Sequence, residues 1–261
     1  MYLNKKVTLS KGGLSIIIPV YNEEDNIYLL IKKIFFYNKS INFEVIIVDD
    51  NSADSTQLRV KQAIKRYSKK IKYFNRKEKV RDLSRSCQLG IKKSKYDNII
   101  IMDGDLQHNP KYILNMMNLF NKKKLDVVVG ARKFDIPSYL NTGQSYIRYI
   151  FSKILVLIIN ITFRKKTKDP MSGFFLFRKT LFTNNEKKLY LKGYKILVDI
   201  LYSPMKNIKV DDYFIKFNKR NYGTSKMSLR VFFQLLIFYF VILKKILLKN
   251  IYSFLNYKFS N

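Results

Sequence analysis

The sequence predicts an α/β fold: a mostly parallel β-sheet flanked by helices. Three observations predict it. Short apolar runs alternate with segments of helical periodicity through the first half of the chain. Acidic or amide residues directly follow three of the apolar runs. The length, 261 residues, suits one large α/β domain with extensions and is enough to bury a sizeable core.

The elements of the first half follow from this alternation. Five apolar runs predict strands, at residues 14–20, 43–49, 71–75, 98–102 and 126–130. Four segments with apolar residues at helical spacing predict helices, at residues 25–37, 54–67, 82–93 and 110–121. The last of these helices has Pro110 in its first turn, where proline is favoured. Alternating strands and helices predict right-handed βαβ units, in which ligands bind beyond the carboxyl ends of the strands.

The second half has a different pattern. Residues 174–177 and 210–217 are expected to be strands and residues 195–202 a helix. Two longer apolar stretches, 146–163 and the region after residue 229, are expected to form amphipathic helices at a membrane interface, the second over about 229–255. We therefore expect one folded domain over residues 1–228, which includes the 146–163 helix, and a membrane-associated tail over residues 229–261.

Neither apolar stretch is expected to span a membrane. A spanning helix needs roughly 20 apolar residues. Lys153 interrupts the first stretch, and the uninterrupted part of the second ends at Lys244. Lysines at such ends can reach the headgroups while the apolar face stays in the lipid. The alternative is that these stretches pack against the sheet or a partner, including a membrane protein that binds the tail.

Composition restricts the classes of partner. Fifty Lys and Arg against 19 Asp and Glu give a formal charge of +31, which attracts nucleic acid, anionic lipid or phosphorylated substrates. A biased codon usage explains such a lysine excess equally well. No recognised nucleic-acid-binding module is present, so no nucleic-acid partner is expected. A single cysteine, Cys87, excludes an internal disulfide and is expected to lie in the core. Residues 1–13 lack the apolar run of a signal peptide, and a cytoplasmic setting is expected.

The residues after the fourth strand have the chemistry of a metal site. Asp103 and Asp105, separated by Gly104, offer two carboxylates to one hard divalent cation, and oxygen ligands suit Mg²⁺ or Mn²⁺. A cation there would neutralise charge on a departing diphosphate. Acidic residues also follow the first two strands, so we expect all three strand ends to line one crevice. Asp54 is interpreted instead as a helix cap.

Several motifs together resemble a known family, the polyprenyl-phosphate sugar transferases of the dolichol-phosphate mannose synthase type. These are inverting enzymes of glycosyltransferase family 2 with the GT-A (Rossmann-like) fold. The similarity covers about residues 14–226. It rests on six motifs: Ile18–Glu23, Val48–Ser52 with Asp54, Asp82–Arg85, Met102–His108, Asp169–Phe175 and Tyr222–Lys226.

The resemblance implies roles for individual residues. The expected donor-binding residues are Pro19, Tyr21, Glu23, Asp50, Asp103 and Lys226. The expected metal ligands are Asp103, Asp105 and Gln107. The expected catalytic residues are Asp105, Arg132 and Arg220. The expected acceptor-phosphate residues are Arg148 and Ser152.

Spacing supports part of this assignment. Arg148 and Ser152 are four residues apart and would share one helix face, presenting a guanidinium and a hydroxyl to one phosphate. The alternative is that Arg148 only solubilises an apolar helix. His108, the only histidine, is expected to start a helix or support the metal segment rather than bind the metal.

The sequence thus predicts inverting transfer of a sugar, with mannose favoured, from a nucleotide sugar to a polyprenyl monophosphate. The donor is GDP-mannose or a UDP-sugar, and the enzyme would lie on the cytoplasmic face of a membrane as a peripheral or monotopic protein. Two alternatives stay open: a family 2 enzyme that glycosylates a saccharide or protein hydroxyl, and a basic nucleic-acid-binding protein.

Overall fold

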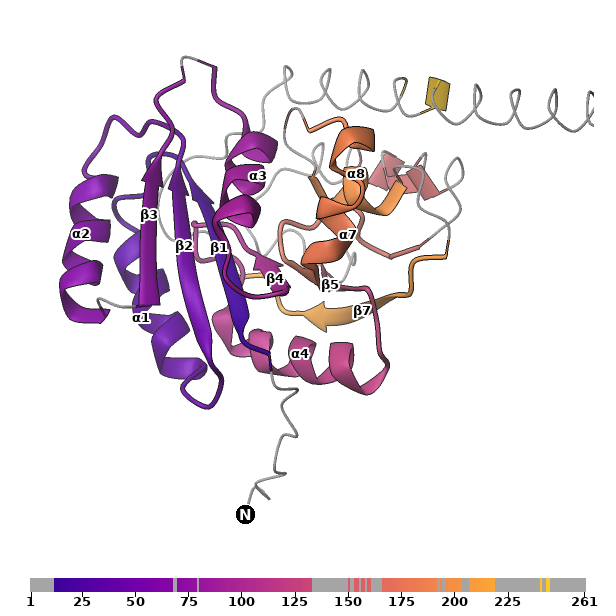
Figure 1. Cartoon of the computed structure of the whole chain (residues 1–261), viewed down its shortest axis with the longest axis horizontal. Coiled ribbons are helices and arrows are strands. Elements are labelled where there is room, and N and C mark those ends of the chain that lie inside the picture. Colours follow the sequence, from indigo (N-terminus) through magenta and orange to yellow (C-terminus); the bar gives the residue numbers. More distant parts are fainter. Residues whose placement is uncertain are drawn as a thin grey trace, which may run out of the picture.

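The fold is a seven-stranded mixed sheet covered by helices on both faces (Figure 1). It was obtained as a computed structural model. The structure describes residues 12–67, 70–78, 80–132, 150, 153–154, 156–157, 159–160, 166–191, 193, 196–202, 207–218, 240 and 243–244.

The strands form where apolar residues occur in short runs. Their bounds are β1 Leu14–Val20, β2 Phe43–Asp49, β3 Ile71–Asn75, β4 Asn98–Ile101, β5 Val127–Arg132, β6 Phe175–Arg178 and β7 Val210–Ile215. Their order in the sheet is β3-β2-β1-β4-β6-β5-β7. Every neighbouring pair is parallel except those made by β6, which is antiparallel to both β4 and β5. The prediction of a mostly parallel sheet is confirmed.

Helices cover the two faces of the sheet in two groups. One face packs on α1 (Ile27–Tyr37), α2 (Thr56–Tyr67) and α4 (Ile113–Lys122). The other face packs on α3 (Leu83–Lys93), α7 (Lys179–Thr183) and α8 (Ile196–Tyr202). Alternate residues of β1 supply the two cores: Ile16 and Ile18 face the first group and Ile17 faces the second. This alternation follows from the two-residue period of a strand.

A 3₁₀ turn accounts for one of the differences from the predicted helix bounds, whereas the other predicted helices begin one or two residues later than expected. The predicted helix at 110–121 begins as a 3₁₀ turn over Pro110–Tyr112 before α4, and a second turn lies at Glu186–Lys188. Side-chain oxygens complete two helix starts. Asp82 accepts from the N–H of Arg85 at the start of α3, and Asn109 accepts from Lys111.

The two expected interface helices lie mostly outside the described residues. Residues 150, 153–154, 156–157 and 159–160 are helical, as are 240 and 243–244. In the described part of the chain, no helix is long and apolar enough to cross a membrane.

Candidate active site

The loops after β1 and β2 are locked together at the carboxyl edge of the sheet. The N–H of Asn22 donates to the Ser52 hydroxyl (2.9 Å), and Oδ1 of Asn22 accepts from the N–H of Ala53 (2.9 Å). The N–H of Glu23 donates to the hydroxyl of Thr56 (2.8 Å). Asn22 has a φ of 49°, a left-handed conformation that asparagine tolerates. The predicted donor residues after β1 are therefore held at fixed positions.

Asp50, the residue directly after β2, belongs to a buried cluster of charged and polar groups. Its Oδ1 accepts from Nη1 of Arg76 (2.5 Å) and its Oδ2 from the N–H of Asp82 (2.7 Å). Nη1 of Arg76 also donates to the Asp82 carbonyl and to the hydroxyl of Ser86. Burial raises the pKa of Asp50, and the guanidinium of Arg76 opposes that shift. Arg76 directly follows β3, so a fourth strand end contributes to this edge.

The ring of Tyr21, a predicted donor residue, has a cation on its face. The guanidinium carbon of Arg81 lies 4.4 Å from the ring centroid, within the range of a cation–π contact. Arg81 is next to Asp82, whose N–H binds Asp50. Tyr21 and Asp50 are thus connected through the start of α3 as well as through the strand ends.

The Asp103–Gln107 segment forms a tight turn. Leu106 has a φ of 63°, and the N–H of Gln107 consequently folds back onto Oδ1 of Asp105 (3.1 Å). Asn218, just beyond β7, fixes the turn: its N–H donates to the Gln107 carbonyl (3.0 Å), and its carbonyl accepts from Nε2 of Gln107 (3.3 Å). A left-handed leucine is strained, and such strain is commonly found at functional sites.

The imidazole of His108 lies next to the Asp103 carboxylate. Nδ1 of His108 is 3.5 Å from Oδ2 of Asp103, and its ring stacks on Phe174. Burial lowers the pKa of His108, so the neutral form is favoured. Nδ1 has no hydrogen-bond partner among the described residues.

Arg132, the last residue of β5, is held by a buried carboxylate. Its Nε and Nη2 donate to the two oxygens of Asp169 (2.7 and 2.9 Å), which is a bidentate fork. The ring of Phe217 lies 5.4 Å from this guanidinium and 5.2 Å from the His108 ring. Phe217 therefore contacts both Arg132 and His108, the residue that follows the Asp103–Gln107 segment.

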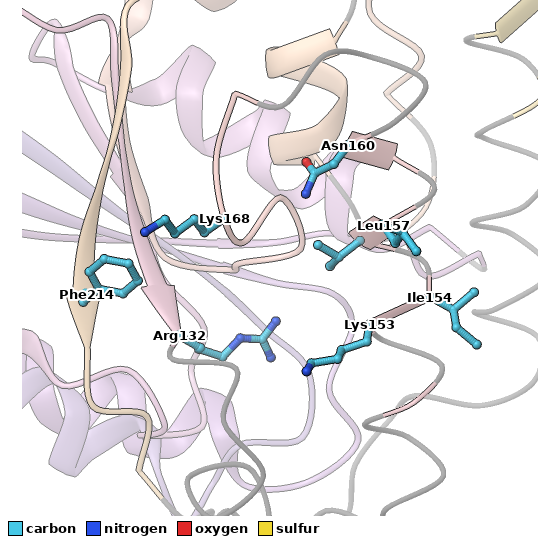
Figure 2. Close-up of a pocket in the computed structure, with 8 residues that line it drawn as sticks. Arg132, Lys153, Ile154, Leu157, Asn160, Lys168 and Phe214 are labelled. Carbon is cyan, nitrogen blue, oxygen red and sulfur yellow. The ribbon is translucent and has the colours of Figure 1, made fainter.

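A cavity of about 450 Å³ opens beside Arg132 (Figure 2). Its polar lining is cationic or neutral, and the rest of its wall is apolar. The lining residues are Arg132, Lys153, Ile154, Val156, Leu157, Asn160, Lys168 and Phe214. Figure 2 shows the side chains of Arg132 and Lys153 pointing toward each other. This arrangement suits an anionic head group attached to an apolar chain.

Asp103, Asp105 and Gln107 carry oxygen donors of the kind that suits a divalent cation shared with a substrate. Among the described residues no group of three or more His, Cys, Asp or Glu side chains is placed to hold a metal ion. Mg²⁺ at phosphate-transfer sites is typically held by one or two carboxylates plus the phosphates of the substrate, so no closed cage is required. The side chain of Asp103 is 37% exposed, so it is accessible to such a ligand.

The structure therefore brings many of the predicted residues to one edge of the sheet. Those that it places there are Pro19, Tyr21, Glu23, Asp50, Asp103, Asp105, Gln107 and Arg132. Those outside the described residues are Arg148, Ser152, Arg220 and Lys226.

The comparison of sequences gives the family. Residues 15–184 match the profile of glycosyl transferase family 2. The chain belongs to this family.

Two curated relatives of this family 2 chain have the same name. A dolichol-phosphate mannosyltransferase of Pyrococcus furiosus is 32% identical over 229 residues, which is 85% of this chain and 61% of that protein. A dolichol-phosphate mannosyltransferase of Mycosarcoma maydis is 29% identical over 236 residues, 88% of this chain and 78% of that protein. The chain thus spans less than two thirds of the length of the Pyrococcus protein.

Solved structures confirm the GT-A-like fold. Glucosyl-3-phosphoglycerate synthase of Mycobacterium tuberculosis, in complex with phosphoglyceric acid, superposes with a TM-score of 0.66 at 16% identity. The match covers 87% of this chain and 79% of that one. The same enzyme in complex with Mn²⁺, UDP and glucosyl-3-phosphoglycerate gives a TM-score of 0.65 at 14% identity, covering 86% and 76% of the two chains.

Several residues of this family 2 site were not predicted from the sequence. Arg76 follows a predicted strand directly, and applying the strand-end rule to β3 would have found it. Asp54 was interpreted correctly: it accepts from the N–H and hydroxyl of Thr56, next to the start of α2. Phe217 and Asn218 carry no local signal, because their role depends on contacts with residues more than a hundred positions away.

Proposed function

We propose that this family 2 enzyme transfers a sugar, with mannose favoured, from a nucleotide sugar to a polyprenyl monophosphate, inverting the anomeric carbon. The observation that carries the proposal is the pairing of two sites around Phe217: an acidic segment with metal-ligand chemistry and a cationic, apolar-walled cavity. The two relatives named dolichol-phosphate mannosyltransferase support it.

The acidic side is assigned to the donor. Tyr21, Glu23 and Asp50 would contact the nucleoside of GDP-mannose or a UDP-sugar, together with Pro19 and Lys226. Asp103, Asp105 and Gln107 would hold Mg²⁺ or Mn²⁺ at the diphosphate. The bound cation would supply charge neutralisation for the departing diphosphate.

The cationic side is assigned to the acceptor. Arg132, Lys153 and Lys168 surround a volume that suits a phosphate, and Leu157 and Phe214 offer an apolar wall for the first part of the lipid. Arg148 and Ser152 are close in sequence to Lys153, and Arg220 is two residues beyond Asn218. Each of these three is proposed to contact a phosphate.

The chemistry then needs positioning more than base catalysis. A phosphate monoester is largely ionised near pH 7, so its oxygen can attack the anomeric carbon without first losing a proton to the protein. The new carbon–oxygen bond forms as the bond to the nucleoside diphosphate breaks, and the bonding electrons leave with the diphosphate. Arg132 and its neighbouring cations would hold the two anions together against their repulsion.

The acceptor's lipid places the reaction at a membrane. We propose that residues 1–228 form the catalytic domain and that residues 229–261 form a membrane-associated tail on the cytoplasmic face. The described residues Ile154 and Leu157, which are exposed on the 146–163 segment, support a lipid contact there. A membrane protein bound through the tail is the alternative arrangement.

An acceptor comparison tests the proposal. Purified protein, Mn²⁺ and a panel of GDP- and UDP-sugars are incubated with a short polyprenyl phosphate, the matching polyprenol, or a soluble saccharide. We expect transfer to the polyprenyl phosphate alone. Asp105→Ala should lower the rate about 100-fold or more, as loss of transition-state charge stabilisation does elsewhere. Lys123→Met, an exposed charge change, should not. Transfer to the saccharide but not to the phosphate would instead favour a hydroxyl acceptor.

A further inference from the structure

One short segment, the 167–173 loop, touches both sides of the proposed site. The loop is anchored by hydrogen bonds at each end. The hydroxyl of Thr167 donates to the carboxylate of Asp212 on β7. Near the other end the hydroxyl of Ser172 donates to the carbonyl of Gly130 on β5 (2.8 Å). The loop is therefore fixed to the same part of the sheet that carries Arg132.

Asp169, in the middle of the loop, is fully buried and binds Arg132 three times. Its Oδ2 accepts from the backbone N–H (3.2 Å) and Nε (2.7 Å) of Arg132, and its Oδ1 accepts from Nη2 (2.9 Å). A carboxylate with no exposed surface cannot itself touch a substrate. The fork fixes the plane of the guanidinium, which lines the cavity.

Gly173, at the end of the loop, packs directly on Asp103. A Cβ at position 173 would lie 2.7 Å from Cγ of Asp103 and closer still to its Oδ2. Glycine is required for this close approach, since any side chain would displace the carboxylate. The loop backbone therefore sets the position of Asp103 just as Asp169 sets that of Arg132.

We propose that the 167–173 loop is a positioning device that fixes the distance between the two anion-binding halves: Asp169 positions Arg132 and Gly173 positions Asp103. This inference rests on the proposed function and adds two positioning residues to it. Bringing two phosphates together requires both groups to be held to within about 0.5 Å. A displacement of about 1 Å can cost on the order of 100-fold in rate.

Two substitutions in the loop should each impair the use of a different ligand. Asp169→Asn keeps the shape but removes the charge from the fork. We expect the KM for polyprenyl phosphate to rise about tenfold or kcat to fall by that factor, with the affinity for a nucleoside diphosphate and Mn²⁺ changed less than twofold. Gly173→Ala should lower that affinity about tenfold in calorimetry and leave binding to polyprenyl-phosphate vesicles within twofold. A merely structural role would weaken both ligands equally in both variants and would overturn the proposal.

A double-mutant cycle tests whether Asp169 acts through Arg132. If it does, Asp169→Asn should have little further effect in an Arg132→Met background, because the group that it positions is gone. Full additivity of the two losses would overturn the inference. Asp169→Glu keeps the charge and should retain more activity than Asp169→Asn, and it replaces that variant if Asp169→Asn does not fold. Lys123→Met serves as the control variant throughout.

The binding measurements separate the inference from the proposed function. If no sugar is transferred to polyprenyl phosphate but Gly173→Ala still weakens nucleotide and Mn²⁺ binding selectively, the proposed acceptor is wrong and the role of Gly173 stands. If wild-type protein transfers sugar and both variants match it in rate and affinity, the proposed function stands and the positioning role is wrong.

Discussion

Removal of the Arg76 guanidinium should strongly destabilise the fold. Arg76→Met keeps most of the apolar stem but leaves the Asp50 carboxylate with one donor among the described residues, the N–H of Asp82. The side chains of Arg76 and Asp50 are 3% and 9% exposed, so water cannot replace the lost partner. Breaking a buried ion pair by deleting one member typically costs about 3–5 kcal/mol, a large part of the ~5–15 kcal/mol that a folded domain has.

The cost should depend on pH in a defined direction. Burial raises the pKa of Asp50 in the folded protein, and the charge of Arg76 partly lowers it again. Without Arg76 the folded-state pKa should rise further above the unfolded value. A carboxyl group whose pKa is higher in the folded protein than in the unfolded chain stabilises the fold at pH values below the unfolded-chain pKa. This stabilisation is lost as the pH rises through the pKa of the folded protein. The deficit of Arg76→Met should be largest at neutral pH and shrink toward about pH 4.

Urea unfolding across this pH range measures the effect. The chain has 19 tyrosines and no tryptophan, so tyrosine fluorescence and far-UV circular dichroism are suitable probes. Lys123→Met removes a charge from an exposed pair with Asp211 and should cost about 0–1 kcal/mol at any pH. An Arg76→Met deficit as small as this control, or one that does not change between neutral and acid pH, would refute the reasoning.

Three further outcomes follow from packing and contacts. Burial raises the pKa of the Cys87 thiol, so a thiol reagent should modify Cys87 only after the protein unfolds. Rapid modification of the native protein would contradict the position of Cys87 in the core. Gly90→Val would place a Cβ 2.5 Å from Cγ2 of Ile17 and should lower the free energy of unfolding by about 1–3 kcal/mol. An unchanged midpoint of thermal denaturation would show that the contact between α3 and β1 is looser than the structure indicates. Arg81→Ala removes the cation from the face of the Tyr21 ring. It should weaken the binding of a nucleoside diphosphate about two- to fivefold, a loss of roughly 0.5–1 kcal/mol. An equal effect of Arg85→Ala, the exposed neighbour, would indicate only a general charge effect.

The fold was largely predictable because its strands are short, continuous apolar runs. Residues 14–20, 43–49 and 71–75 are strands with the predicted bounds. The direction of β6 was not predictable, since periodicity identifies a strand but not its orientation in the sheet. The 3₁₀ turn at Pro110 also escaped prediction, because helical spacing over one turn does not separate the two kinds of helix.

The site was predictable where its residues follow strands and not where it depends on distant contacts. Asp103, Asp105 and Arg132 occur at strand ends, and the sheet brings these ends together. The Asp169–Arg132 fork joins residues 37 positions apart, and the Asp50–Arg76 pair joins residues 26 positions apart. Spacing of this length has no periodic signature in a sequence, so such pairs become visible only once the strands are placed.

The central claim is that the acceptor is a lipid phosphate, and one measurement tests it directly. Purified chain is incubated with Mn²⁺, a short polyprenyl phosphate and, one at a time, each member of a panel of radiolabelled nucleotide sugars that includes GDP-mannose. The label that partitions into the lipid phase is identified by mass spectrometry. A polyprenyl-phosphate hexose that disappears with Asp105→Ala and persists with Lys123→Met is the predicted result. Label that stays in the aqueous phase with every nucleotide sugar of the panel, while the same protein glycosylates a soluble saccharide, would contradict the account.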